Sequence, residues 1–313
     1  MSLKYSVAII DDQIQFFEFY KEIIEEHLSA NGFYAEVDHI SSEKNFESYP
    51  ISMPNMYMID LKFGNDDKGQ NFIRKIREQQ LTDILFYSSD HEAIENYKLE
   101  FGSQGIFFAE KEEQNDEVIV ILEKMLDKMI STCNTPRTTR GLIMECVAEL
   151  DDIIKEKIML LYSKLTDEQI ISYRKRILEK IKNSYDGRLN DLKRFFDQDF
   201  ANKIENASVI NSDNGFLIED LIEEIKITDS SKNLSFLLSL YKILFSKDDL
   251  YKDIAKYQEL LSKRNILAHV SQSMEGDQIV FKNKDYIYTL SDEECLSLRT
   301  NILSLTAAIK SIH

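Results

Sequence analysis

The chain has 313 residues, a length that suits two domains, and its 43% hydrophobic content with 18 Phe and 15 Tyr is enough for buried cores. Its net charge of −17 lies almost wholly in residues 1–130, which hold 26 acidic and 12 basic side chains, against 29 and 26 in residues 131–313. The first part would repel a polyanion and the second is nearly neutral, so the charge neither requires nor excludes nucleic-acid binding.

Cysteine usage and hydropathy exclude several other classes of protein. Cys133, Cys146 and Cys295 form no CxxC pair, which favours a reduced, cytoplasmic setting without a structural zinc site. A strand-like segment starts almost at the N-terminus, so we expect no signal peptide. No uncharged apolar segment reaches about 18 residues, so we expect no membrane span.

Residues 1–130 alternate between strand and helix patterns. Near-continuous apolar segments predict five buried strands, and segments with helical periodicity separate and follow them. This alternation predicts a doubly wound, parallel five-stranded sheet covered on both faces. The predicted strands are KYSVAII (4–10), YAEVDHI (34–40), MYMIDL (56–61), DILFYSS (83–89) and GIFFAE (105–110).

The polar, Thr-rich segment STCNTPRTTR (131–140) predicts a linker, and the rest of the chain, 141–313, predicts an all-helical domain with one exception. In that exception, residues 278–290, two alternating segments flank Asn283-Lys284-Asp285, which indicates a β-hairpin. Helices are expected over residues 141–164, 166–183, 187–207, 216–227, 231–246, 249–269 and 291–312.

Polar side chains follow the predicted strands of the first domain where each strand ends. These residues are Asp11, Asp12, Asp60, Ser88 and Lys111. Ligands of doubly wound sheets bind at the carboxyl ends of the strands, so the five side chains should meet in one crevice. Clustered carboxylates repel one another unless a cation joins them, and their hard oxygens select Mg²⁺. A carboxylate can also attack a phosphoryl group and hold it as an acyl phosphate.

This arrangement resembles the receiver domain of two-component response regulators across residues 1–130. The resemblance implies that Asp60 is the phosphoacceptor, loaded by a sensor histidine kinase or a small phosphodonor. It implies that Mg²⁺ is held by Asp11, Asp12, Asp60 and the backbone carbonyl of Lys62.

The same resemblance assigns roles to the remaining residues of the crevice. Ser88 would be the switch hydroxyl, Lys111 the lysine that pairs with the phosphoryl group, and Phe108 the aromatic switch. Gly69 fits the glycine that starts the third helix of the family. Receivers commonly dimerise through their fourth and fifth strand–helix units, so a homodimer is expected.

The main feature of the second domain is Arg264-Asn265-x3-His269, near the end of a long predicted helix. Asn265 and His269 share a helical face, whereas Arg264 is rotated by roughly 140° from His269. No helix-turn-helix, Gly-rich phosphate loop or Cys/His metal set is found beside it.

The order of this motif, the hairpin and a last amphipathic helix resembles the HEPN superfamily, whose signature is an Arg followed by a His. Active members bring two such motifs together across a dimer seam and cleave RNA without metal. The resemblance therefore leaves two alternatives open: an endoribonuclease that uses Arg264 and His269, or a dimerisation or partner-binding module. A third reading is structural, because Arg264, Asn265 and His269 can cap or bridge their own helix.

Overall fold

The computed structural model describes residues 3–64, 66–67, 69–101, 105–111, 117–193, 229–245, 249–275, 278–282 and 287–313. The chain divides into two compact units. The first consists of Met1–Cys146 with Ile266–Leu303, and the second of Val147–Asn265 with Ser304–His313.

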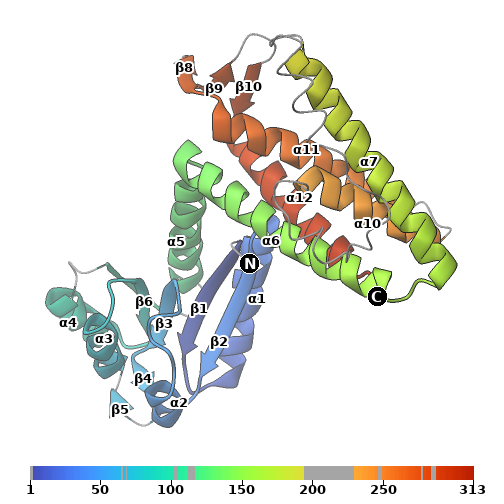
Figure 1. The fold of residues 1–313 in the computed structure, drawn as a ribbon. Helices are drawn as coiled ribbons and strands as arrows, with labels where there is room; N and C mark the ends of the chain where they lie inside the picture. The colour runs from blue at the N-terminus through green and yellow to red at the C-terminus, as the bar shows by residue number, and fades with distance from the viewer. Residues whose placement is uncertain are drawn as a thin grey trace. The chain divides into compact units, whose positions relative to one another are not determined.

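The first unit contains a parallel sheet with helices between its strands (Figure 1). Its elements are β1 (Lys4–Ile10), α1 (Ile14–Ala30), β2 (Tyr34–Ile40), α2 (Glu43–Glu47), β3 (Met56–Asp60), β4 (Lys62–Phe63), β5 (Asp66–Asp67), α3 (Gly69–Arg77), β6 (Asp83–Ser88), α4 (His91–Phe101), β7 (Ile106–Glu110) and α5 (Glu117–Cys133).

The five strands of the main sheet have the order β2-β1-β3-β6-β7 and all pair in parallel. This is the flavodoxin-like order of doubly wound sheets. Every residue of β3 is buried, as expected of a central strand that helices cover on both sides. The predicted fold class and all five predicted strands are confirmed. The short antiparallel pair β4–β5, directly after β3, was not predicted.

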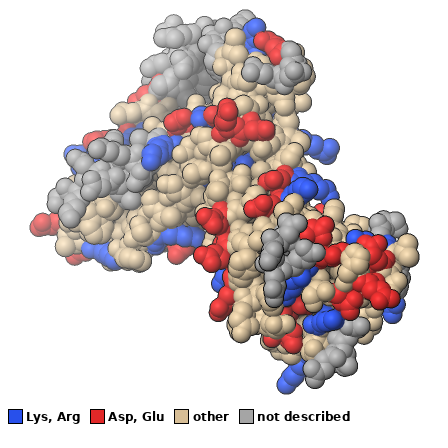
Figure 2. Space-filling model, turned by 180° about the vertical axis from the view of Figure 1, so that it is seen from behind, with Lys and Arg blue, Asp and Glu red and all other residues tan. Residues whose placement is uncertain are grey.

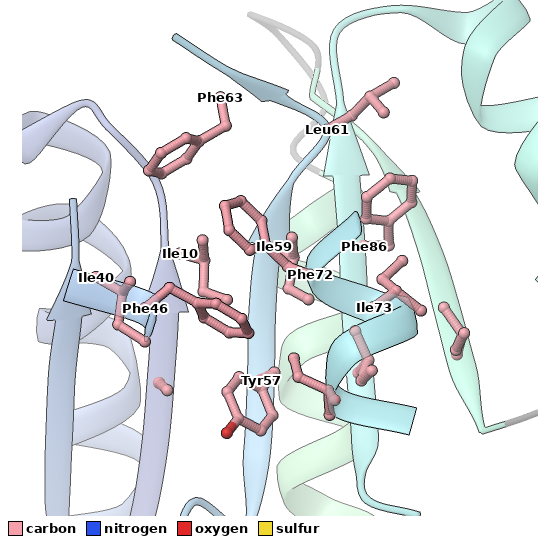
Figure 3. Packing of buried hydrophobic residues seen from close by; sticks show 14 of the residues in the cluster. Ile10, Ile40, Phe46, Tyr57, Ile59, Leu61, Phe63, Phe72, Ile73 and Phe86 are labelled. Carbon is pink, nitrogen blue, oxygen red and sulfur yellow. The ribbon is translucent and has the colours of Figure 1, made fainter. Parts of the chain in front are cut away.

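Helices cover both faces of the sheet. On one face, α2, α3 and α4 share a core with the strands, in which Phe46 and Phe72 pack beside Tyr57, Ile59 and Phe86 (Figure 3). On the other face lie α1 and α5, where Nε2 of His27 lies 2.9 Å from Oδ1 of Asp127. The central strands are thereby buried between two layers of helices.

Residues 131–140, expected as a polar linker, hold the end of one helix and the start of the next, with a turn between them at 134–135. Helix α5 ends at Cys133, and α6 (Pro136–Tyr162) begins three residues later. Pro136 occupies the first helical position, where its missing N–H costs nothing, and the Thr135 hydroxyl accepts the backbone N–H of Thr138 at 3.4 Å. Proline and threonine thus start a helix here instead of breaking the chain.

The second unit is built from helices. It holds most of α6 and of α11 (Asp249–His269), together with α7 (Asp167–Lys193) and α10 (Ser230–Leu244). Tyr173 of α7 is buried and donates to the carbonyl of Phe236 in α10 at 3.3 Å. The break expected after residue 183 is absent, because α7 continues to Lys193. The rest of the helix predicted over 187–207, and the helix predicted over 216–227, lie outside the described residues.

A small antiparallel sheet precedes the last helix. Strands β9 (Gln278–Lys282) and β10 (Ile287–Leu290) confirm the predicted hairpin, although its turn lies outside the described residues. A third strand, β8 (Gln272–Glu275), pairs with β9 and was not predicted. The last helix, α12 (Asp292–Lys310), starts in the first compact unit and ends in the second.

Two bulk properties accompany this fold. None of the described helices is long and apolar enough to cross a membrane. On the face shown in Figure 2, acidic side chains gather over the part of the chain that holds the parallel sheet. The distribution agrees with the excess of Asp and Glu in residues 1–130.

Candidate functional site

The carboxyl edge of the parallel sheet brings the predicted polar residues together. Asp60 ends β3, Ser88 ends β6, and Asp11 and Lys111 directly follow β1 and β7. Pairing of these four strands is continuous, so the strand ends are neighbours. Asp11 and Ser88 are fully buried and Asp60 is 4% exposed. Buried carboxylates at a strand edge are costly, which marks this edge as the candidate site.

Asp60 lies between one cation and other carboxylates. The backbone N–H of Lys62 donates to its Oδ1 at 2.9 Å, and the ammonium of Lys111 lies 3.7 Å from Oδ2. Burial raises the pKa of Asp60 to about 6; Lys111 opposes this rise, and the charges of Asp11 and Asp12 add to it. The carboxylate is therefore held in an environment short of positive charge.

Asp11 is fixed by three hydrogen bonds. Its carboxylate accepts the backbone N–H of Gln13 and the hydroxyl of Tyr87, each at 2.8 Å, and its carbonyl lies 2.8 Å from Nε2 of His39. Burial and the neighbouring Asp11 raise the pKa of Tyr87 well above its usual value, so Tyr87 remains a neutral donor. Sequence reasoning missed Tyr87, because an aromatic residue within a strand indicates core.

Asp12 is the exposed carboxylate of the set. It accepts the backbone N–H of Gly64 at 3.1 Å. Among the described residues, no three Asp, Glu, His or Cys side chains are already arranged around one metal position. The chemistry of the donors nevertheless fits Mg²⁺, because Asp11 and Asp12 raise the pKa of Asp60 and a divalent cation would reverse that effect.

Lys111 has a partner that the sequence did not reveal. Its ammonium lies 3.0 Å from the ring centroid of Phe16, in the first turn of α1, and 5.5 Å from that of Tyr87. Its backbone N–H donates to the carbonyl of Ser88 at 2.8 Å. The lysine is thus shared between a carboxylate and an aromatic face. The sequence did not predict this contact, because Phe16 has the spacing of an ordinary apolar residue on the buried face of α1.

The two predicted switch residues lie on adjacent strands. The Ser88 hydroxyl accepts the backbone N–H of Asp90 at 3.1 Å. Phe108 is half-buried in β7, and its ring meets that of Phe86 edge to face, with centroids 5.9 Å apart. Their switch roles stay predictions, as does the role of the Lys62 carbonyl. The Lys62 ammonium lies 3.4 Å from Asp90 Oδ2 at the rim of the site.

Gly69 is needed for close packing behind Asp60. A Cβ atom at this position would lie 2.6 Å from the Asp60 carbonyl oxygen and 2.7 Å from Cα of Leu61. Both are backbone atoms and cannot rotate away. Glycine therefore lets the start of α3 approach the end of β3, which agrees with the expectation for Gly69.

The second predicted motif lies at the end of α11, and its catalytic role stays a prediction. Arg264, half-buried in the second unit, donates to the Ser230 hydroxyl at 3.5 Å. That hydroxyl bonds Asp151, which also accepts the Tyr257 hydroxyl at 2.7 Å. Asn265 and His269 are exposed.

Comparisons with known proteins leave the family open. No protein-family model and no curated protein matches the chain. A receiver domain of a DNA-binding response regulator from Colwellia psychrerythraea is 16% identical, with a TM-score of 0.33 over 41% of this chain and 98% of that one. A receiver-domain protein from Clostridium thermocellum is 15% identical, with a TM-score of 0.33 over 41% and 95%. Likenesses at this level of identity and TM-score do not show what this protein does.

Proposed function

We propose that this protein is a two-component response regulator in which Asp60 accepts a phosphoryl group from a histidine kinase or a small phosphodonor. The observation that carries the proposal is the pairing of buried Asp60 with Lys111, beside Asp11 and Ser88, at the carboxyl edge of the sheet. A structural ion pair alone would not need two further acidic side chains that oppose ionisation of Asp60.

The residues of the site have distinct roles in this reaction. An Asp60 carboxylate oxygen attacks phosphorus, an O–P bond forms, and the donor's P–N or P–O bond breaks, with its electron pair leaving on the donor. The Lys111 ammonium, 3.7 Å from Oδ2, neutralises one phosphoryl oxygen, and the Ser88 hydroxyl can donate to another. Mg²⁺, held by Asp11, Asp12, Asp60 and the Lys62 carbonyl, would supply the remaining positive charge.

The helical part, in our proposal, is a HEPN-like output module that dimerises or binds a partner. The arrangement of Arg264 favours this reading over the ribonuclease. Its guanidinium contacts Ser230, and Ser230 and Tyr257 both bond Asp151, so the arginine belongs to a polar network among α6, α10 and α11. Such a network fixes helix packing and does not require a substrate.

The test is phosphorylation by acetyl phosphate with Mg²⁺. The wild type should gain one phosphoryl group that is stable to acid and labile to base, and Asp60→Asn should gain none. Asp152→Asn, which alters an aspartate whose side chain is 81% exposed in the second unit, is the matched control and should label like the wild type. Equal labelling of Asp60→Asn and the wild type would overturn the assignment.

A further inference from the structure

Helix α1 contacts the candidate site at one end and the C-terminal helix at the other. At its first turn, the ring of Phe16 lies against the Lys111 ammonium, at 3.0 Å. One turn later, Tyr20 is buried and meets the ring of Tyr87 edge to face, with centroids 5.5 Å apart. Tyr87 in turn holds Asp11. Two separate contacts therefore connect the start of α1 with the carboxylate and cation of the site.

At the other end of α1, Arg299 of α12 is 3% exposed and binds the residues that follow the helix. Its Nε donates to the carbonyl of Asn31, the C-cap of α1, at 2.9 Å, and its guanidinium lies 4.7 Å from the ring centroid of Phe33. Gly32, with φ of +74°, leaves no space for a side chain, because a Cβ would lie 2.7 Å from Cβ of Arg299. The turn after α1 is thus shaped to receive this arginine.

The same arginine also holds the end of α5. Nη1 donates to Oδ1 of Asn134, the residue after α5, at 2.7 Å. All three of these partners, the Asn31 carbonyl, the Asn134 amide and the Phe33 ring, are uncharged, and burial lowers the pKa of Arg299, although an arginine stays protonated at neutral pH. Because Arg299 is a buried cation without a carboxylate partner among these contacts, its binding depends on where the neighbouring dipoles lie. One of these dipoles is the carboxyl end of α1.

We infer that α1 couples the candidate phosphoacceptor site to α12, so that a change at Lys111 alters how firmly Arg299 holds the first half of the C-terminal helix. The part of this inference that concerns phosphorylation rests on the proposed function of Asp60 as phosphoacceptor. A phosphoryl group on Asp60 draws the Lys111 ammonium away from Phe16 and removes a cation–π contact from the first turn of α1. The helix has 17 residues and is about 25 Å long, so a shift at its start reaches Asn31.

The consequence concerns the output part of the chain. The first half of α12 belongs to the compact unit that holds the sheet, and its residues from Ser304 belong to the second unit. A helix that spans both units can pass a change in its own anchoring to the helices of the second. Coupling of this kind is typically worth a change of about 5-fold to 150-fold between two sites.

The experiment is hydrogen exchange of the full chain, read by mass spectrometry in peptides covering residues 295–303. Phe16→Leu keeps apolar bulk but removes the aromatic face, and it should speed exchange in 295–303 by about 5-fold or more. Phe19→Leu, on the same helix but 44% exposed, is the matched control and should leave exchange unchanged. Lys111→Gln removes the ammonium instead of the ring and should act like Phe16→Leu. Peptides of β3 should exchange as in the wild type in all three variants, which excludes general loosening.

Phosphorylated wild type should show the same faster exchange in 295–303, and Arg299→Lys should abolish its dependence on phosphorylation. If Phe16→Leu and Lys111→Gln both leave 295–303 as protected as Phe19→Leu does, the coupling is overturned. If acetyl phosphate does not modify Asp60 but the two variants still release 295–303, the coupling stands and the phosphoacceptor proposal falls. If Asp60 is modified and residues 295–303 do not respond in any variant, the coupling falls alone.

Discussion

Asp60 shows how burial and neighbouring charge act on one side chain. Its carboxyl is 4% exposed, and burial, opposed by Lys111 and reinforced by Asp11, raises the pKa to about 6 from an ordinary value of 3.8. A carboxyl whose pKa is higher in the folded state stabilises the fold most when protonated, below about pH 4. That stability is lost as the pH rises through 6. At neutral pH, ionised Asp60 costs about 3 kcal/mol.

We therefore predict that Asp60→Asn stabilises the protein at pH 7.5 in metal-free buffer, by about 2–3 kcal/mol in the free energy of unfolding. At pH 4 the difference from the wild type should shrink to about 0.5 kcal/mol, because the carboxyl is then protonated in the folded state and close to half protonated in the unfolded state. Denaturant unfolding at the two pH values measures this, with Asp152→Asn as the exposed control. A difference that is the same at both pH values would contradict the account of Asp60.

A second prediction at this scale separates Arg264 from His269. Arg264 takes part in the Ser230–Asp151–Tyr257 network, so Arg264→Ala should lower the free energy of unfolding by about 1–2 kcal/mol. His269 is exposed, and His269→Ala should change it by less than about 0.5 kcal/mol. Denaturant unfolding measures both. Metal-independent cleavage of single-stranded RNA by the wild type, lost in both variants, would instead favour the ribonuclease.

The polar residues of the candidate site could be selected from the sequence alone. Asp11, Asp60, Ser88 and Lys111 stand at strand ends, and alternation of strands and helices is enough to predict that strand ends meet. Phe16 and Tyr87 could not be found this way, because their roles depend on which polar atom each ring or hydroxyl reaches. The pattern of apolar residues in a sequence predicts which side chains are buried, but it does not predict which polar atom each of them contacts.

At the scale of elements, the junction between β3 and α3 depends on Gly69. We predict that Gly69→Ala lowers the free energy of unfolding by about 1–3 kcal/mol, because the new methyl group would overlap the backbone of Asp60 and Leu61. Gly141→Ala is the matched control: it is exposed within α6 with no atom within 4 Å of the new Cβ, and it should stabilise by about 0.5–1 kcal/mol. Thermal unfolding compares them. Equal effects of the two substitutions would mean that β3 and α3 are less tightly packed than the structure indicates.

Elements with strong periodicity were predicted well, and short or polar ones were not. The five buried strands read as apolar segments, and the β9–β10 hairpin as alternation around a turn. Strand β8 was missed because all four of its residues are exposed, so no face of it is marked by apolar residues. Residues 131–140 were taken as a linker because composition alone cannot distinguish a Thr-Pro helix start from a Thr-Pro loop.

At the scale of the whole molecule, the compact units do not follow the order of the chain. Residues 266–303 belong with the parallel sheet, and Arg299 binds Asn31 across 268 positions of sequence. Periodicity and spacing predict contacts between residues that are close in sequence, and they predict which strand ends meet in a sheet. They do not predict a contact between segments as far apart as Asn31 and Arg299. The C-terminal helix was therefore expected only as a part of the output domain.

The central claim, that Asp60 is a phosphoacceptor, is tested most directly by locating the modified residue. The full chain is treated with acetyl phosphate and Mg²⁺, digested under acidic conditions that preserve acyl phosphates, and analysed by mass spectrometry. The account predicts one phosphoryl group, on the peptide that contains Asp60, and none when Mg²⁺ is removed by a chelator. A phosphoryl group found elsewhere in the chain, or no modification of Asp60 in a folded wild-type protein, would contradict it.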